Sequence, residues 1–162
     1  MRFLFYDSIA DIEKGKRITG RKSFTLSEEF MRRHFTKKAL VPGVIMIEAM
    51  AQVLGWLVIY SHDFRISAVM SLIEGVTFPS ALQPGVTVEI HGEIISTSKR
   101  DSLGRAWITH QDKTIASLDR IIFSHFHKVN QEELINRFCY YSGMDKALIS
   151  GQLQSDDSAA EK

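Results

Sequence analysis

The longest apolar run in the chain extends from Val44 to Tyr60, and it predicts a helix that is buried on most sides. Pro42 and Gly43 come immediately before it, and proline suits the first turn of a helix. Glu48 and Gln52 interrupt the run at i, i+4 spacing, which places both side chains on one helix face. A carboxyl group in so apolar a run is costly unless it has a partner or a chemical role. The surroundings of this helix are therefore the first place to look for a functional site.

Elsewhere, apolar and polar residues alternate, a pattern that predicts strands. The predicted strands are 16–26, 65–78, 86–98, 105–111 and 114–126. The first is expected to kink at Gly20, because glycine weakens a strand interior, and the second to break at Glu74 and Gly75. Asp112 and Lys113 predict a hairpin between the last two strands.

Residues 131–142 have a helical pattern, with Asn130 placed to cap the helix. A short lead-in with a strand or helical turn at Phe3–Tyr6 precedes the first strand. Residues 1–150 show no internal repeat or linker and are predicted to form one domain, whereas the polar segment 151–162 is predicted to be a disordered tail. One buried helix with several long antiparallel strands predicts an α+β fold, in which a curved sheet wraps around the helix.

Composition narrows the possible partners and locations. The chain has 162 residues, of which 44% are hydrophobic, and a formal net charge of +1, so no overall field favours nucleic acid. The run 44–60 falls short of the roughly 20 residues that a membrane span requires, so no span is expected. Cys139 is the single cysteine, which precludes an internal disulfide and favours a reducing cytoplasm.

The chemistry suggested by the central stretch combines three kinds of group. His34 can move a proton near neutral pH, Glu48 offers a carboxyl group in apolar surroundings, and the Gly43 N–H is a donor at the positive end of the helix dipole. These parts suit removal of a proton next to a thioester carbonyl, followed by loss of a β-hydroxyl. From spacing alone, other interpretations remain open: a surface histidine at His34, an ion-pair partner at Glu48, and a side chain that satisfies a buried backbone group at Gln52.

The pattern HF-x4-L-VPGV-x3-EAMAQ, which begins at His34 and ends at Gln52, resembles the signature of 3-hydroxyacyl-[acyl-carrier-protein] dehydratases of the hot-dog superfamily. The weaker resemblance over residues 5–127 includes the segment SLIEGVTFPSALQPG. It implies a hot-dog fold, a homodimer that could associate further into a trimer of dimers, and an acyl-carrier-protein thioester as substrate. The sequence departs from the family pattern at Arg33, Thr36 and Ala39, which indicates a specialised relative.

The resemblance also assigns roles by position. His34 and Glu48 are the implied catalytic pair, contributed by different subunits of the dimer. The Gly43 N–H is implied to bind the thioester carbonyl, beside Val44, and Gln52 to support the acid. One further substrate-binding position, an aromatic residue near the acyl tunnel, falls on Phe78.

Two other functions compete with the dehydratase. A thioesterase of the same fold would use a carboxylate with water, and a non-catalytic acyl-binding or assembly subunit would keep only the fold. The pair of His34 with PGV favours the dehydratase. No metal or other cofactor is expected, because His125 and His127 form at most half of a metal site. The basic residues of the loop predicted at 30–41 could receive an acidic carrier protein or simply be solvated.

Overall fold

The computed structural model describes residues 3–32, 38–79, 81–147 and 149. The elements in this part of the chain are two strands, a short 3-10 helix, a long helix, four strands and a second helix. They are β1 (Ser8–Glu13), β2 (Arg17–Phe24), η1 (Glu29–Arg32), α1 (Gly43–Ser61), β3 (Ser67–Thr77), β4 (Val86–Thr97), β5 (Asp101–His110), β6 (Lys113–Phe126) and α2 (Gln131–Ser142).

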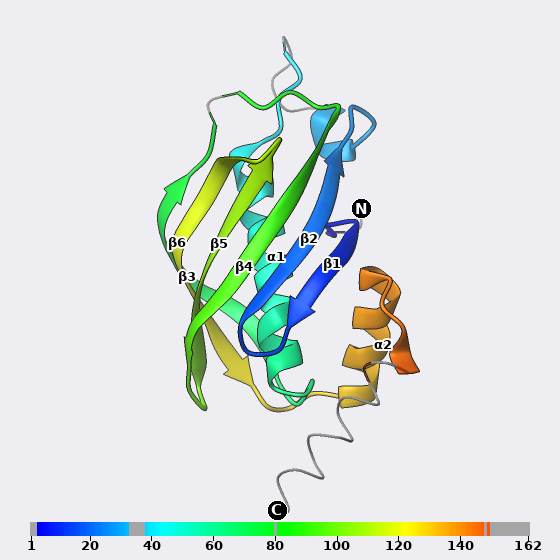
Figure 1. Cartoon of the computed structure of the whole chain (residues 1–162), viewed down its shortest axis with the longest axis vertical. Coiled ribbons are helices and arrows are strands. Elements are labelled where there is room, and N and C mark those ends of the chain that lie inside the picture. Colours follow the sequence, from blue (N-terminus) through cyan, green and yellow to red (C-terminus); the bar gives the residue numbers. More distant parts are fainter. Residues whose placement is uncertain (1–2, 33–37, 80, 148, 150–162) are drawn as a thin grey trace, which may run out of the picture.

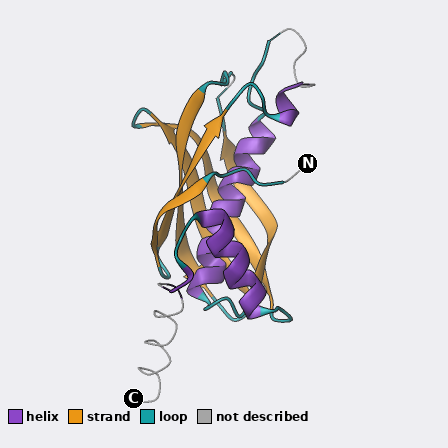
Figure 2. Ribbon diagram, turned by 90° about the vertical axis from the view of Figure 1, so that its right-hand side faces the viewer, coloured by secondary structure: helices purple, strands orange, loops and turns teal. Residues whose placement is uncertain are grey.

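Within the described residues, six strands form one antiparallel sheet in the order β1-β2-β4-β5-β6-β3. The chain leaves β2, runs through α1, and returns to the far edge of the sheet as β3, so the helix crosses the sheet diagonally (Figure 1). The sheet curves around α1 on one side, and α2 lies on the side that it leaves open (Figure 2). This confirms the predicted hot-dog fold.

Helix α1 is the core of the molecule. It contacts all six strands, and side chains such as Met46, Val53 and Leu54 are fully buried. By length and composition it could cross a membrane, but most of it lies inside the sheet. Glycines on the sheet allow this close approach: a Cβ on Gly104 would lie 2.6 Å from the Glu93 carbonyl oxygen and 2.9 Å from Leu54 Cδ2. The chain therefore needs glycine at this position to seat the helix.

Strand β1 was not predicted at its observed position. The sequence suggested regular structure at Phe3–Tyr6, whereas the strand is formed by Ser8–Glu13. Its pairing with β2 shifts register between Ile9 and Asp11, and this bulge breaks the alternation that would have revealed the strand. Strand β2 runs through Gly20 without a register shift against β4; a Cβ there would lie 2.9 Å from Val53 Cγ2, so close packing explains this glycine.

Two other boundaries also differ from the prediction. Strand β3 continues through Gly75, which adopts a positive φ of 63°, and its pairing irregularity lies between Met70 and Leu72. Strand β5 begins at Asp101, four residues earlier than predicted. The turn before it is short because Ser98 Oγ accepts hydrogen bonds from the N–H groups of the second and third residues after it.

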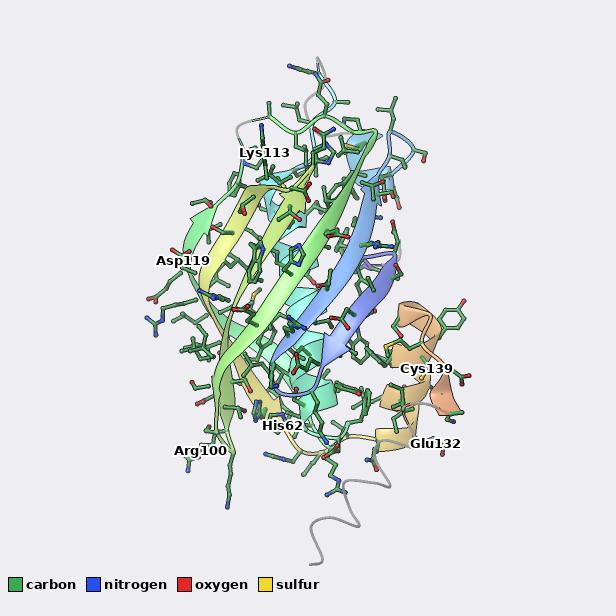
Figure 3. All side chains as sticks on the ribbon, in the orientation of Figure 1. His62, Arg100, Lys113, Asp119, Glu132 and Cys139 are labelled. Carbon is green, nitrogen blue, oxygen red and sulfur yellow. The ribbon has the colours of Figure 1, made fainter. Side chains whose placement is uncertain are left out.

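Helix α2 was predicted with its observed bounds, and the Asn130 side chain caps it by accepting from the Glu133 N–H at 3.1 Å. Phe138 is fully buried and anchors α2 to α1, with its ring centroid 5.2 Å from that of Trp56. Cys139 lies on the same helix (Figure 3), and burial raises the pKa of its thiol, as suits a packing residue better than a nucleophile.

Candidate functional site

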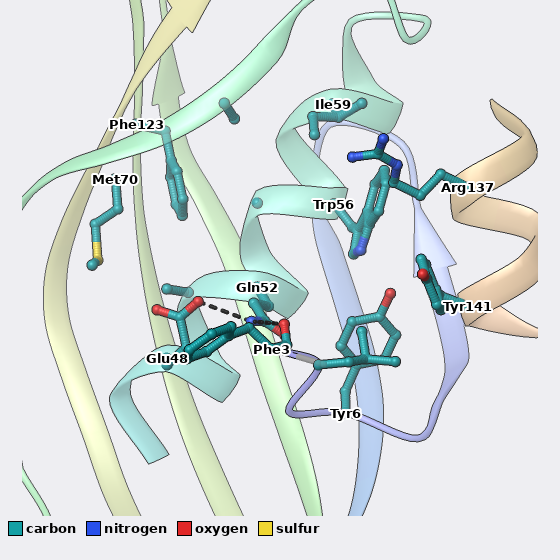
Figure 4. A pocket seen from close by; sticks show the side chains of 14 residues that line it. Phe3, Tyr6, Glu48, Gln52, Trp56, Ile59, Met70, Phe123, Arg137 and Tyr141 are labelled. Carbon is teal, nitrogen blue, oxygen red and sulfur yellow. Dashed lines mark hydrogen bonds between the residues drawn. The ribbon is translucent and has the colours of Figure 1, made fainter. Parts of the chain in front are cut away.

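A groove follows the open side of α1, bounded by the N-terminal segment, by β3 and by α2 (Figure 4). Its volume is about 520 Å³, within the range of ligand-binding pockets. Helix α1 contributes Glu48, Gln52 and Trp56, β3 contributes Met70, and α2 contributes Arg137. The groove therefore combines apolar side chains with several polar groups, a lining that can accept an acyl chain.

Gln52 holds the Glu48 carboxyl group in this groove. Its Nε2 donates to Glu48 Oε1 at 2.9 Å and to the Phe3 carbonyl oxygen at 3.0 Å, and its Oε1 accepts from the Phe5 N–H at 2.9 Å. Both roles considered for Gln52, supporting the acid and satisfying backbone groups, are thus present. Within the described residues no lysine or arginine pairs with Glu48, so the ion-pair alternative finds no support there.

Gly43 begins α1, about 7.5 Å along the helix axis from Glu48. No side chain caps this end, and N–H groups in a first turn have no intrahelical partner. The Phe78 ring packs directly on Gly43, where a Cβ would lie 2.6 Å from Phe78 Cε2. Phe78 is half exposed and Val44 is 66% exposed, so both border solvent at this end of the helix. The structure therefore brings Gly43 and Phe78 together at the start of α1.

His34, the predicted proton acceptor, lies outside the described residues. No histidine lines the groove in the part of the chain that the structure describes. The two histidines considered as half of a metal site are engaged separately: His125 Nε2 is 2.9 Å from Ser102 Oγ, and His127 Nε2 is 3.2 Å from the Lys99 carbonyl oxygen. Among the described residues, the groove of a single chain thus contains Glu48, the acid of the predicted catalytic pair.

Sequence reasoning did not predict which side chains meet at the far end of the groove. Tyr6, Trp56, Arg137 and Tyr141 meet there from three different elements (Figure 4). One local signal was available, because Arg137 and Tyr141 are spaced i, i+4 and share a face of α2. The meeting of that face with the N-terminal segment is a tertiary contact, which local patterns do not encode.

Comparison with known proteins places this geometry in a family. The model of the FabA-like domain matches residues 1–119. The 3-hydroxyacyl-[acyl-carrier-protein] dehydratase FabZ of Pediococcus pentosaceus is 30% identical over 117 residues, covering 72% of this chain and 78% of that protein. The corresponding protein of Variovorax paradoxus is 36% identical over 112 residues, covering 65% and 75%. Among solved structures, the dehydratase heterocomplex ApeI:P from Xenorhabdus doucetiae superposes with a TM-score of 0.60 at 15% identity, covering 83% of this chain and 90% of that one. The chain therefore belongs to the family of FabA-like domains.

Proposed function

We propose that the protein is a 3-hydroxyacyl-[acyl-carrier-protein] dehydratase, which converts a (3R)-hydroxyacyl thioester into a trans-2-enoyl thioester and water in fatty-acid or related lipid or polyketide synthesis. The observation that carries the proposal is the Glu48 carboxyl group, held by Gln52 in a partly apolar groove about 1.5 turns from the helix start, which no side chain caps. The FabZ relatives carry this activity in their names. The single cysteine fits a cytoplasmic enzyme.

The proposed mechanism divides the reaction among three groups. The carbonyl oxygen accepts a hydrogen bond from the Gly43 N–H, where the helix dipole stabilises the negative charge that develops. His34 takes the α-proton, and the electron pair of that C–H bond forms the new double bond. The bond between the β-carbon and its hydroxyl breaks, and Glu48 donates the proton that releases the hydroxyl as water. Gln52 keeps the acid in place by its hydrogen bond of 2.9 Å.

We further propose that the site is completed by a second copy of the chain, which supplies His34 to the groove of the first. Strand β3 supports this arrangement, because it is an edge strand whose exposed side chains include Val69, Met70 and Leu72. A long apolar edge readily pairs with another strand. Pairing two β3 edges would bury these residues and bring a second chain beside the groove, since Met70 also lines it.

The direct test uses a trans-2-enoyl and a saturated acyl carrier-protein thioester. The enoyl substrate should be hydrated, and the saturated thioester should release no thiol. Glu48→Gln and His34→Ala should each lower the hydration rate about 100-fold or more, the scale of a positioned acid or base. Glu93→Gln, which changes a partly exposed glutamate on β4, should leave the rate within about twofold. Rates near wild type in either active-site variant would contradict the proposal.

Mixing the two inactive variants tests the shared site. If His34 and Glu48 act across the dimer interface, half of the randomly mixed dimers contain one intact site, so about a quarter of the wild-type rate returns after subunit exchange. If both residues act within one chain, every site keeps one lesion and no activity returns.

A further inference from the structure

One wall at the far end of the groove is built by a part of the chain that lies beyond the match to the family. That match ends at residue 119, whereas α2 is formed by Gln131–Ser142. The helix is firmly docked, because the buried ring of Phe138 lies 5.2 Å from the Trp56 ring and 5.5 Å from the Phe64 ring. Arg137 of α2 is thereby held as a wall of the same groove that contains Glu48.

The polar groups at this end include an unsatisfied buried hydroxyl. Tyr6 is 1% exposed, lines the groove, and its Oη has no hydrogen-bond partner among the described residues. The Trp56 N–H lies near this oxygen but does not meet hydrogen-bond geometry. Burial raises the pKa of Tyr6 to about 12, so its hydroxyl is neutral and able to donate at physiological pH. A buried donor without an acceptor is unfavourable, and a ligand oxygen would relieve it after a movement of the lining side chains, because the Tyr6 oxygen has less than 1 Å² of accessible surface.

The surrounding groups are also donors. An indole N–H and a guanidinium group can only donate, and a tyrosine hydroxyl can donate, so Trp56, Arg137 and Tyr141 all favour an acceptor. The Arg137 guanidinium bonds Glu133 at 2.8 Å, but both side chains are more than half exposed and such pairs are weak. That bond occupies one guanidinium nitrogen, and the other N–H groups remain for a ligand. Several donors with one positive charge match a carboxylate.

The distance to Glu48 fixes where on a substrate this group would lie. Glu48 and Trp56 are eight residues apart on α1, about 12 Å along the axis. An extended chain advances about 1.2 Å per bond, since the three bonds of one residue span roughly 3.3–3.6 Å. Measured along the helix axis to the level of Trp56, this end of the groove therefore lies about ten bonds from the carbon at which Glu48 acts.

We propose that the groove selects acyl thioesters whose chain ends in a carboxylate, which binds Arg137 and the Tyr6 hydroxyl about ten bonds from the reacting carbon. This proposed selectivity rests on the proposed dehydratase activity. Under it, α2 contributes to the choice of substrate. The chemistry stays with Glu48 at the other end of the groove, so the two ends of the substrate are recognised by separate groups.

The test compares trans-2-enoyl pantetheine thioesters of about twelve carbons that end in a methyl, a hydroxyl or a carboxylate group. The wild-type kcat/KM should be at least about tenfold higher for the carboxylate than for the methyl compound, with the hydroxyl compound between them. Arg137→Gln should lower this ratio about tenfold, and Tyr6→Phe, which removes one oxygen atom, about fivefold. Arg105→Gln is the matched control, because Arg105 has similar exposure and pairs with Glu93 on the sheet, away from the groove.

Three results would overturn the proposal: a wild-type ratio of one or less, equal ratios in Arg137→Gln and Arg105→Gln, or an unchanged ratio in Tyr6→Phe. Failure of the dehydratase proposal is separate, since it would appear as no turnover of any of the compounds. In that case calorimetric binding of the saturated methyl and carboxylate pantetheine thioesters measures the same ratio without catalysis. Equal affinity for the two saturated compounds would then reject the carboxylate site by itself.

Discussion

Replacing Gln52 by leucine tests whether one side chain supports both the fold and the acid. Leucine has a similar size but cannot form the three hydrogen bonds that join Gln52 to Glu48, to the Phe3 carbonyl oxygen and to the Phe5 N–H. Phe5 is 3% exposed, so little water can reach its N–H group in place of the lost acceptor. The variant therefore removes the link between the N-terminal segment and α1 and frees the carboxyl group at the same time.

The magnitude follows from these contacts. Each lost hydrogen bond contributes about 1 kcal/mol net, and a buried N–H left without an acceptor costs about 1–3 kcal/mol. Two bonds hold the N-terminal segment, so the free energy of unfolding of Gln52→Leu should fall by about 2–4 kcal/mol. For a chain of this size the melting temperature should fall by about 2–4 °C for each kcal/mol. The hydration rate at a temperature where the variant is folded should fall about tenfold, because the acid loses its position.

Urea unfolding and the enoyl-thioester assay, at one fixed protein concentration, measure the two effects. Gln131→Leu is the control: the Gln131 side chain donates to the Asp63 carbonyl oxygen at 2.7 Å in an exposed setting, so stability should change by less than about 0.5 kcal/mol. A Gln52→Leu protein that is as stable and as active as this control would refute the reasoning. Loss of stability with full activity would show that Gln52 serves the fold and not the acid.

Three further variants test other parts of the molecule. Gly43→Ala should displace the Phe78 ring and lower the hydration rate about tenfold, while urea unfolding shows a change of less than about 1 kcal/mol, because that ring is half exposed and can move. Burial by itself would lower the pKa of Lys22, but hydrogen bonds to Glu28 and a second carboxylate raise it. The stability that Lys22 provides is therefore complete below the unfolded-state pKa of about 10.4 and is lost as pH rises through the higher folded-state value. Lys22→Met should lower the free energy of unfolding in urea by about 1–3 kcal/mol at pH 7 and should reduce the loss of stability at alkaline pH. An unchanged dependence of stability on alkaline pH would contradict this. Burial and a neighbouring histidine lower the pKa of His125. The stability that neutral His125 provides is therefore complete above about pH 6.5 and is lost as pH falls. His125→Gln should reduce this loss of stability at acid pH, as measured by unfolding over a pH series.

Local patterns were sufficient for the helices and for the placement of Glu48 beside Gln52 on one face of α1. The apolar run of α1 and the Asn130 cap of α2 gave bounds within a residue of those observed, because periodicity and capping are local properties. The spacing of Glu48 and Gln52 also predicted correctly that both face one side, where they are hydrogen bonded. Roles that depend on a second copy of the chain, including the one given to His34, stay predictions.

Non-local features were beyond local reasoning. The β1 bulge removed the alternation that reveals a strand, and only the pairing with β2 makes the segment regular. The bonds from Gln52 to the backbone of Phe3 and Phe5 join residues nearly fifty positions apart. The wall formed by Arg137 depends on the docking of α2, which the burial of Phe138 determines. In each case the missing information was which surfaces meet.

The aromatic contact between α2 and α1 has a consequence for the evolution of the chain. Phe138 packs against Trp56 and Tyr60, so the helix that forms the groove wall depends on residues within the core helix. Substitutions on the two helices should therefore be epistatic, with energetic effects that do not add. A related sequence that acquired α2 alone, without aromatic residues at the two α1 positions, would have a C-terminal helix that does not pack in this way on the core. The wall of the groove and the composition of the core are thus inherited together in this protein.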